Sequence, residues 1–221
     1  FGPRQIAHQY EELKRTLETM FGPCDSTVLK AVRDRQIVAP YTNGYRENKL
    51  ADCGAELIRE VYEVEPEDHH VEEMTEARYR AFMEGMEVAD EVLALLRKLQ
   101  GRYRLALLSN YPCGRSIRDC LAKLGLAEFF EAILISGEVG FVKPHPRPYE
   151  LLLEMLELEA GQCVYIGDNW LADVQGAKGI GMRAILTTQH VPYEKFERRE
   201  GDHEPDARIG HLGELEGHFL A

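Results

Sequence analysis

This 221-residue sequence has few basic residues, no paired cysteine motif and no long apolar run. Lysine and arginine number 26 against 38 aspartate and glutamate residues, which gives a formal net charge of −12. Binding to nucleic acid or to anionic membranes depends on clustered basic side chains, so neither partner is expected. No apolar run approaches the roughly 18 residues that a membrane-spanning helix needs.

The cysteines do not indicate a disulfide-bonded or zinc-binding fold. There are five, an odd number, and none forms a C-x-x-C pair. This pattern fits neither a disulfide scaffold nor a zinc knuckle, and we expect reduced thiols in a cytoplasmic protein. No glycine-rich turn of the G-x-G-x-x-G type follows a first strand, which argues against a dinucleotide-binding dehydrogenase.

Residues 1–100 have the apolar spacing of successive helices. In the first helix, apolar residues recur at intervals of three and four, which places on one face Ile6, Tyr10, Leu13, Leu17 and Met20. Gly22-Pro23 ends this helix, and Asp25 or Ser26 can cap the next. Three further helical patterns follow, over 50–62, 70–83 and 88–99. No strand is expected in this half.

Residues 102–221 alternate short β-type runs with helical patterns. The expected strands are 103–108, 132–135, 163–166, 183–187 and 207–209. Helices are expected near 117–124, 149–158, 172–179 and 212–219. This alternation predicts βαβ units and a parallel sheet, in which ligands bind beyond the carboxyl ends of the strands. The charged stretch 192–205 is predicted to be an exposed loop.

Polar side chains follow the first two of these strands. Ser109 and Asn110 precede a helix, where a hydroxyl and free N–H groups suit an anion; a plain N-cap is the alternative. Lys143 stands beside three prolines in the segment 144–148, which fix the backbone and aim the side chain. A surface lysine beside a turn is the alternative interpretation.

Two carboxylates follow the third strand. Asp168 comes directly after Gly167, and Asp173 lies five residues further on. Carboxylates that converge on one crevice repel each other unless a cation lies between them, and hard oxygen ligands suit Mg²⁺. The alternative is that Asp173 only caps its helix.

Together these segments resemble the haloacid dehalogenase-like (HAD) hydrolase superfamily. The resemblance rests on Leu107-Leu108-Ser109-Asn110, on Gly140-Phe141-Val142-Lys143-Pro144, and on Ile166-Gly167-Asp168 with Asp173. It covers 86–221 closely and 1–85 only in architecture. It implies an α/β fold, a Rossmann-like parallel sheet core over 86–221 with a small all-helical cap domain over 1–85.

The resemblance also implies a chemistry. We expect a Mg²⁺-dependent phosphohydrolase that acts on a small phosphorylated metabolite through an aspartyl-phosphate, as a monomer or homodimer. Ser109 and Lys143 would be catalytic, and with Asn110 they would bind phosphate. Asp168 and Asp173 would hold the metal. A 2-haloacid dehalogenase of the same fold is the alternative enzyme, although that branch lacks the Gly-Asp start of the last motif.

One family feature is absent. The first motif is a strand ending in Asp-x-Asp-x-Thr, and the superficially similar segment 24–27 follows Pro23, which would occupy the nucleophile position. Since the chain starts at Phe1 and not at Met, we expect the motif to lie upstream; a catalytically inactive binding protein is the alternative. Cap residues that select the substrate are less defined, with Tyr41, Asn43 and Tyr45 as candidates.

Overall fold

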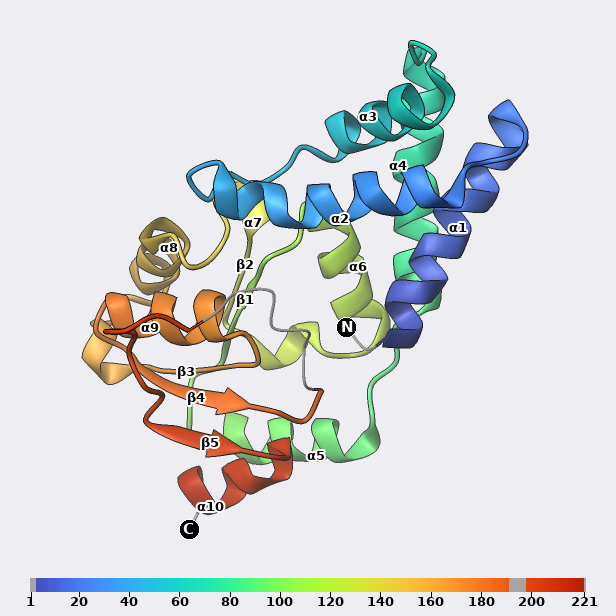
Figure 1. Ribbon diagram of the computed structural model, residues 1–221. Helices are drawn as coiled ribbons and strands as arrows, with labels where there is room; N and C mark the ends of the chain where they lie inside the picture. Colours follow the sequence, from blue (N-terminus) through green and yellow to red (C-terminus); the bar gives the residue numbers. More distant parts are fainter. Residues whose placement is uncertain (1–2, 191–197, 221) are drawn as a thin grey trace.

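A computed structural model describes residues 3–190 and 198–220. The helices predicted for the first hundred residues are confirmed (Figure 1). They are α1 (Pro3–Phe21), α2 (Ser26–Thr42), α3 (Leu50–Tyr62), α4 (Asp68–Glu84) and α5 (Asp90–Gln100). Asp25 caps α2 as expected, because its Oδ1 accepts hydrogen bonds from the N–H groups of Thr27 (2.8 Å) and Val28 (3.3 Å).

Helices α1 to α4 bury their apolar faces against one another. Their shared core contains Leu13, Leu17, Leu29, Val32, Leu57, Ile58 and Met74. The predicted stripe on α1 is therefore buried at its centre, whereas Ile6 at one end is 57% exposed. Burial of these side chains supplies the stabilisation that short helices cannot reach alone. The boundary between cap and core at 85 and 86 stays a prediction.

All five expected strands are present and parallel. They are β1 (Ala106–Ser109), β2 (Ala132–Ile135), β3 (Val164–Gly167), β4 (Arg183–Thr187) and β5 (Ala207–Ile209). Strand β1 pairs with β2, and β3 pairs with β4, which pairs with β5. With helices on its faces this is the expected α/β core.

The sheet is interrupted between β1 and β3. Among the described residues no backbone ladder joins these two strands. Side chains link them instead, since Tyr165 of β3 donates a hydrogen bond from its hydroxyl to the Leu108 carbonyl of β1 (3.1 Å). Every residue of β3 is only half-buried, although strands of a parallel sheet are normally buried on both faces. The described strands thus form two separate parallel sheets, β1-β2 and β3-β4-β5.

The connecting helices follow the predictions with local differences. They are α6 (Gly114–Lys123), α7 (Ser136–Val139), α8 (Pro146–Leu156), α9 (Gly176–Gly179) and α10 (Leu215–Phe219). Helix α8 begins three residues earlier than predicted because His145 caps it and a proline fits its first turn. The segment before α9 (Trp170–Gln175) is π-helical. Helix α7 was not predicted, since four residues show no periodicity.

Two further expectations concern the surface. Of the predicted loop 192–205, residues 192–197 lie outside the described residues. Residues 198–205 are irregular and mostly exposed, as predicted. Within the described ranges, no helix has the length and apolar character needed to cross a membrane.

Candidate active site

The predicted site residues lie at one edge of the sheet. Ser109 ends β1, Lys143 follows β2 and α7, and Asp168 follows β3. Helix α2 crosses above the carboxyl ends of β1 and β2 (Figure 1). The strands therefore bring Ser109 and Lys143 to the strand ends that helix α2 crosses.

Lys143 is the centre of this arrangement and is only 7% exposed. Its ammonium donates to Asp173 Oδ1 (2.8 Å), to the Tyr165 hydroxyl (2.7 Å) and to the Leu108 carbonyl (3.2 Å). Burial alone would lower the pKa of Lys143, but the Asp173 carboxylate outweighs it and the pKa is raised. The lysine is thus a fixed positive charge at neutral pH.

Asp173 is held equally firmly, at 5% exposure. Its Oδ1 faces Lys143, and its Oδ2 accepts the N–H of Asn169 (2.8 Å). Gly167 makes room for the carboxylate, since a Cβ there would lie 2.3 Å from Oδ2. Position 167 therefore requires glycine for a steric reason that the sequence alone does not reveal.

Asn110 has a role that sequence reasoning missed. Its side chain accepts the backbone N–H of Lys143 at Oδ1 (2.8 Å) and donates from Nδ2 to the Lys143 carbonyl (3.1 Å). This paired contact joins the end of β1 to the lysine loop. An asparagine amide matches a peptide group in this way, but nothing in its sequence position indicates the partner.

Ser109 and Asp168 differ from these residues because their side chains are available to bind a ligand. Both are half-buried, and in the described part of the chain neither side chain makes a hydrogen bond or ion pair. Burial raises the pKa of Tyr165, and the nearby charges of Asp173 and Asp168 raise it further, so Asp168 lies within electrostatic reach of the buried pair. Among the described residues, a hydroxyl and a carboxylate at the strand ends are thus without a partner.

Of the three cap candidates, one reaches the site. Burial raises the pKa of the Tyr41 hydroxyl, which also contacts the Asn110 side chain. Tyr45 contributes its backbone carbonyl, which accepts the N–H of Val142 (2.9 Å). Asn43 is exposed at the end of α2. Tyr165 itself was missed, because its position within a strand gave no signal.

The loop after α2 is fastened to the core beside the lysine loop. The Glu47 N–H donates to the Gly140 carbonyl (3.0 Å), and the Glu47 carboxylate accepts from the hydroxyl of fully buried Ser136. Ser136 Oγ in turn accepts the N–H of Tyr111 (2.8 Å), so this network connects the helical half to the residues after β1.

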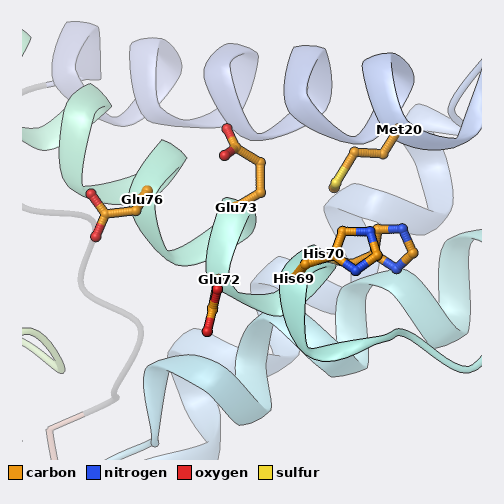
Figure 2. Close-up of a pocket in the computed structure, with 6 residues that line it drawn as sticks. All are labelled: Met20, His69, His70, Glu72, Glu73 and Glu76. Carbon is orange, nitrogen blue, oxygen red and sulfur yellow. The ribbon is translucent and has the colours of Figure 1, made fainter.

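A separate surface cleft of about 640 Å³ lies on α1 and α4 (Figure 2). It is lined by Met20, His69, His70, Glu72, Glu73 and Glu76. Glu73 and Glu76 are already paired with Arg80 (2.7 Å) and Arg115 (2.6 Å). No group of three metal-binding side chains occurs there or elsewhere in the described residues. The strand ends remain the better candidate.

Comparison with known proteins identifies the family. The sequence model of the haloacid dehalogenase-like hydrolases matches residues 26–187, most of the chain. The chain belongs to the haloacid dehalogenase-like hydrolase family. Its match to the human haloacid dehalogenase-like hydrolase domain-containing protein 3 is 36% identical over 101 residues, 45% of this chain and 39% of that protein.

Another HAD-like relative is the phosphoserine phosphatase of Thermus thermophilus, 38% identical over 117 residues, which make up 53% of this chain and 43% of that protein. The chain thus matches about two fifths of the length of each of these relatives.

Solved HAD-like structures agree on the fold. A 2-haloacid dehalogenase from Pseudomonas syringae superposes with a TM-score of 0.73 at 21% identity, covering 98% of this chain and 91% of that one. A HAD hydrolase from Bacillus subtilis bound to magnesium gives a TM-score of 0.72 at 20% identity, covering 98% and 93%. At such identities the likeness establishes the fold alone.

Proposed function

We propose that this chain belongs to a Mg²⁺-dependent phosphohydrolase that acts on a small phosphate ester in the cytoplasm. The observation that carries the proposal is the buried Lys143–Asp173 pair, with Ser109 and Asp168 unpaired beside it. A fixed cation, a hydroxyl and an available carboxylate at one strand edge are suited to a phosphoryl group and its metal. The phosphatase activity named for the Thermus relative points in the same direction.

The nucleophile belongs to a segment that precedes Phe1. No backbone ladder joins β1 to β3 among the described residues, and apart from the Leu108 carbonyl, which already accepts from Lys143 and Tyr165, these edges could pair with one further parallel strand. The ammonium of Lys143 and the hydroxyl of Tyr165 face this interruption through the Leu108 carbonyl. An aspartate at the carboxyl end of such a strand would therefore meet the fixed cation.

The reaction has two steps. A carboxylate oxygen of the upstream aspartate attacks phosphorus, the bond from phosphorus to the leaving oxygen breaks, and a second upstream aspartate protonates that oxygen. The second aspartate then takes a proton from water, whose oxygen attacks phosphorus; the bond from phosphorus to the nucleophilic aspartate breaks, which regenerates its carboxylate and releases inorganic phosphate. Ser109 donates to a phosphate oxygen throughout. Lys143 offsets the negative charge as the anions approach, and Asp173 keeps Lys143 protonated and oriented.

The residues present fit a magnesium ion. Asp168 is a half-buried carboxylate that has no hydrogen-bond partner among the described residues, so its oxygens are free to bind a metal, although the described residues alone do not supply three metal-binding side chains. Asp173 already binds Lys143 and the Asn169 N–H, so it would act through a metal-bound water that uses its remaining lone pairs. Mg²⁺ bound there supplies charge neutralisation for the phosphate.

A 2-haloacid dehalogenase is the second candidate, since Ser109, Asn110 and Lys143 would serve that reaction too. The two are separated by assaying the protein together with its upstream residues. We expect inorganic phosphate release from phosphate esters that requires Mg²⁺, and no chloride release from 2-chloropropionate. Chloride release without metal would replace the proposal, and neither product would indicate an inactive binding protein.

A further inference from the structure

Two arginines of the helical half lie at the boundary with the core without carboxylate partners. Arg33 belongs to α2 and Arg78 to α4. Neither forms an ion pair within the described residues, whereas the neighbouring Arg35 and Arg80 do. Arg33 donates only to the neutral Gln36 Oε1 (3.0 Å), and the Nε atom of Arg78 is buried without a hydrogen-bond partner.

Both guanidinium groups lie within electrostatic range of Tyr111, and that of Arg78 contacts it. The pKa of this buried tyrosine is raised by burial and lowered by the charges of Arg78 and Arg33 and by contact with Arg78. Tyr111 follows Ser109 by two residues and packs against Phe82 of α4, with ring centroids 4.7 Å apart. The arginines thus lie on the side of the helical half that faces the end of β1.

Each guanidinium makes the charged form of the other less favourable, because two positive charges lie close together. Burial and the charge of Arg78 lower the pKa of Arg33 to about 10. The charge of Arg78 also lowers the pKa of the Glu47 carboxyl, but the oxygens of Glu47 are already bound to Ser136 and to the Asn48 N–H. Buried charges are normally paired, and two adjacent arginines in a fork geometry suit a planar anion.

The position of Arg33 on α2 determines how far the arginines lie from the expected phosphate site. Arg33, Ile37 and Tyr41 follow one another at successive turns of α2, and Tyr41 contacts Asn110 beside Lys143. Eight residues of helix rise by about 12 Å. Ile37, between the ends, is a large apolar side chain that is 44% exposed. The stripe therefore runs from the phosphate site, past an apolar surface, to the arginines.

We propose that Arg33 and Arg78 form an anion subsite that binds a second negatively charged group of the phosphorylated substrate, roughly 10 Å from the phosphorus atom. This inference rests on the proposed function. It narrows the substrate class to phosphate monoesters of extended molecules that carry a carboxylate or another phosphate at the far end.

The test compares open-chain ligands that differ only at that end. These are 6-phosphogluconate, with a carboxylate, sorbitol 1,6-bisphosphate, with a second phosphate, and sorbitol 6-phosphate, with a neutral hydroxyl. Their dissociation constants are measured by calorimetry in Mg²⁺ for the wild type, Arg33→Met and Arg78→Met. Arg35→Met is the matched control, since Arg35 lies on α2 but pairs with Glu56 on the exposed surface.

We expect at least one of the two ligands with an anionic far end to bind the wild type tenfold or more tightly than sorbitol 6-phosphate, and the stronger of the two identifies the group. Arg33→Met and Arg78→Met should each remove most of this preference without changing sorbitol 6-phosphate binding, and Arg35→Met should retain it. Both variants should melt no lower than the wild type, because an unpaired buried charge is removed.

Should a methionine variant not fold, the Lys variant replaces it, with an intermediate preference expected. Equal binding of all three ligands, no binding of any, or a preference unchanged in both arginine variants would overturn the subsite. Hydrolysis is scored separately. Preferential binding without turnover leaves the subsite standing and removes the phosphatase proposal, whereas turnover without preference does the reverse.

Discussion

The Lys143 ammonium lies 2.8 Å from Asp173 Oδ1, and both side chains are more than nine-tenths buried. This contact joins the loop after β2 to the π-helical segment after β3 across the interruption in the sheet. Each charge compensates the other, so both groups can stay ionised in the interior. The pair therefore organises the candidate site before any ligand binds.

Breaking this pair should be costly. Lys143→Met or Asp173→Asn alone leaves one buried charge uncompensated, and we expect a loss of about 3–5 kcal/mol in the free energy of unfolding. The double variant should lose much less than the sum of the two. Urea denaturation of the four proteins measures this coupling, and additive losses would show that the pair is not energetically coupled.

Gly167 should be irreplaceable for steric reasons. A Cβ there would meet the Asp173 carboxylate, so Gly167→Ala should lose about 1–3 kcal/mol of stability. Gly179→Ala is the control, because nothing lies within 4 Å of its added Cβ in α9, and it should be neutral or stabilising. Thermal unfolding distinguishes them, and equal effects would refute the clash.

Glu47 should make stability depend on pH. Burial raises the pKa of its carboxyl group, although hydrogen bonds from Ser136 and the Asn48 N–H oppose this. A raised carboxyl pKa stabilises the fold below the unfolded pKa of about 4.3, and this contribution is lost as pH rises through the folded value. Glu47→Gln should therefore be more stable than the wild type at pH 7, with the difference shrinking toward pH 4.

The control for Glu47 is Glu150→Gln on the exposed side of α8. This variant should follow the wild-type stability at every pH. A Glu47→Gln variant that loses stability at pH 7 would show that the carboxylate is needed in its charged form.

Much of the architecture could be predicted from local patterns. Strands 132–135, 183–187 and 207–209 lie where the apolar runs predict, because three or four β-branched and apolar residues between turns leave few alternatives. Clustering of Ser109, Lys143 and Asp168 also followed from the rule that parallel strands present their carboxyl ends together.

The pairwise contacts of the site could not be predicted. Nothing in the sequence indicates that Asn110 clamps the Lys143 backbone or that Tyr165 reaches across to β1. Both contacts join residues more than 30 positions apart and depend on how the strands are placed. The partner of Asp173 was likewise missed, since a carboxylate after a strand serves a metal or a lysine equally well.

Lys143 should also be required for turnover. Lys143→Ala should lower kcat/KM by about 100-fold or more, the cost of one strong electrostatic contact of about 3 kcal/mol. The measurement uses the protein with its upstream residues, with folding checked by circular dichroism. Lys178 of α9 is half-buried and pairs with Asp206, so Lys178→Ala is a matched control that should keep its activity.

The central claim is that this sheet edge hydrolyses phosphate esters with a metal held by Asp168. The most direct measurement is p-nitrophenol release from p-nitrophenyl phosphate as Mg²⁺ is titrated into the protein with its upstream residues and into its Asp168→Asn variant. The account predicts a wild-type rate that rises with Mg²⁺ and disappears with EDTA, and a variant that is folded but at least 100-fold slower. A variant with the wild-type rate and the same Mg²⁺ dependence would contradict it.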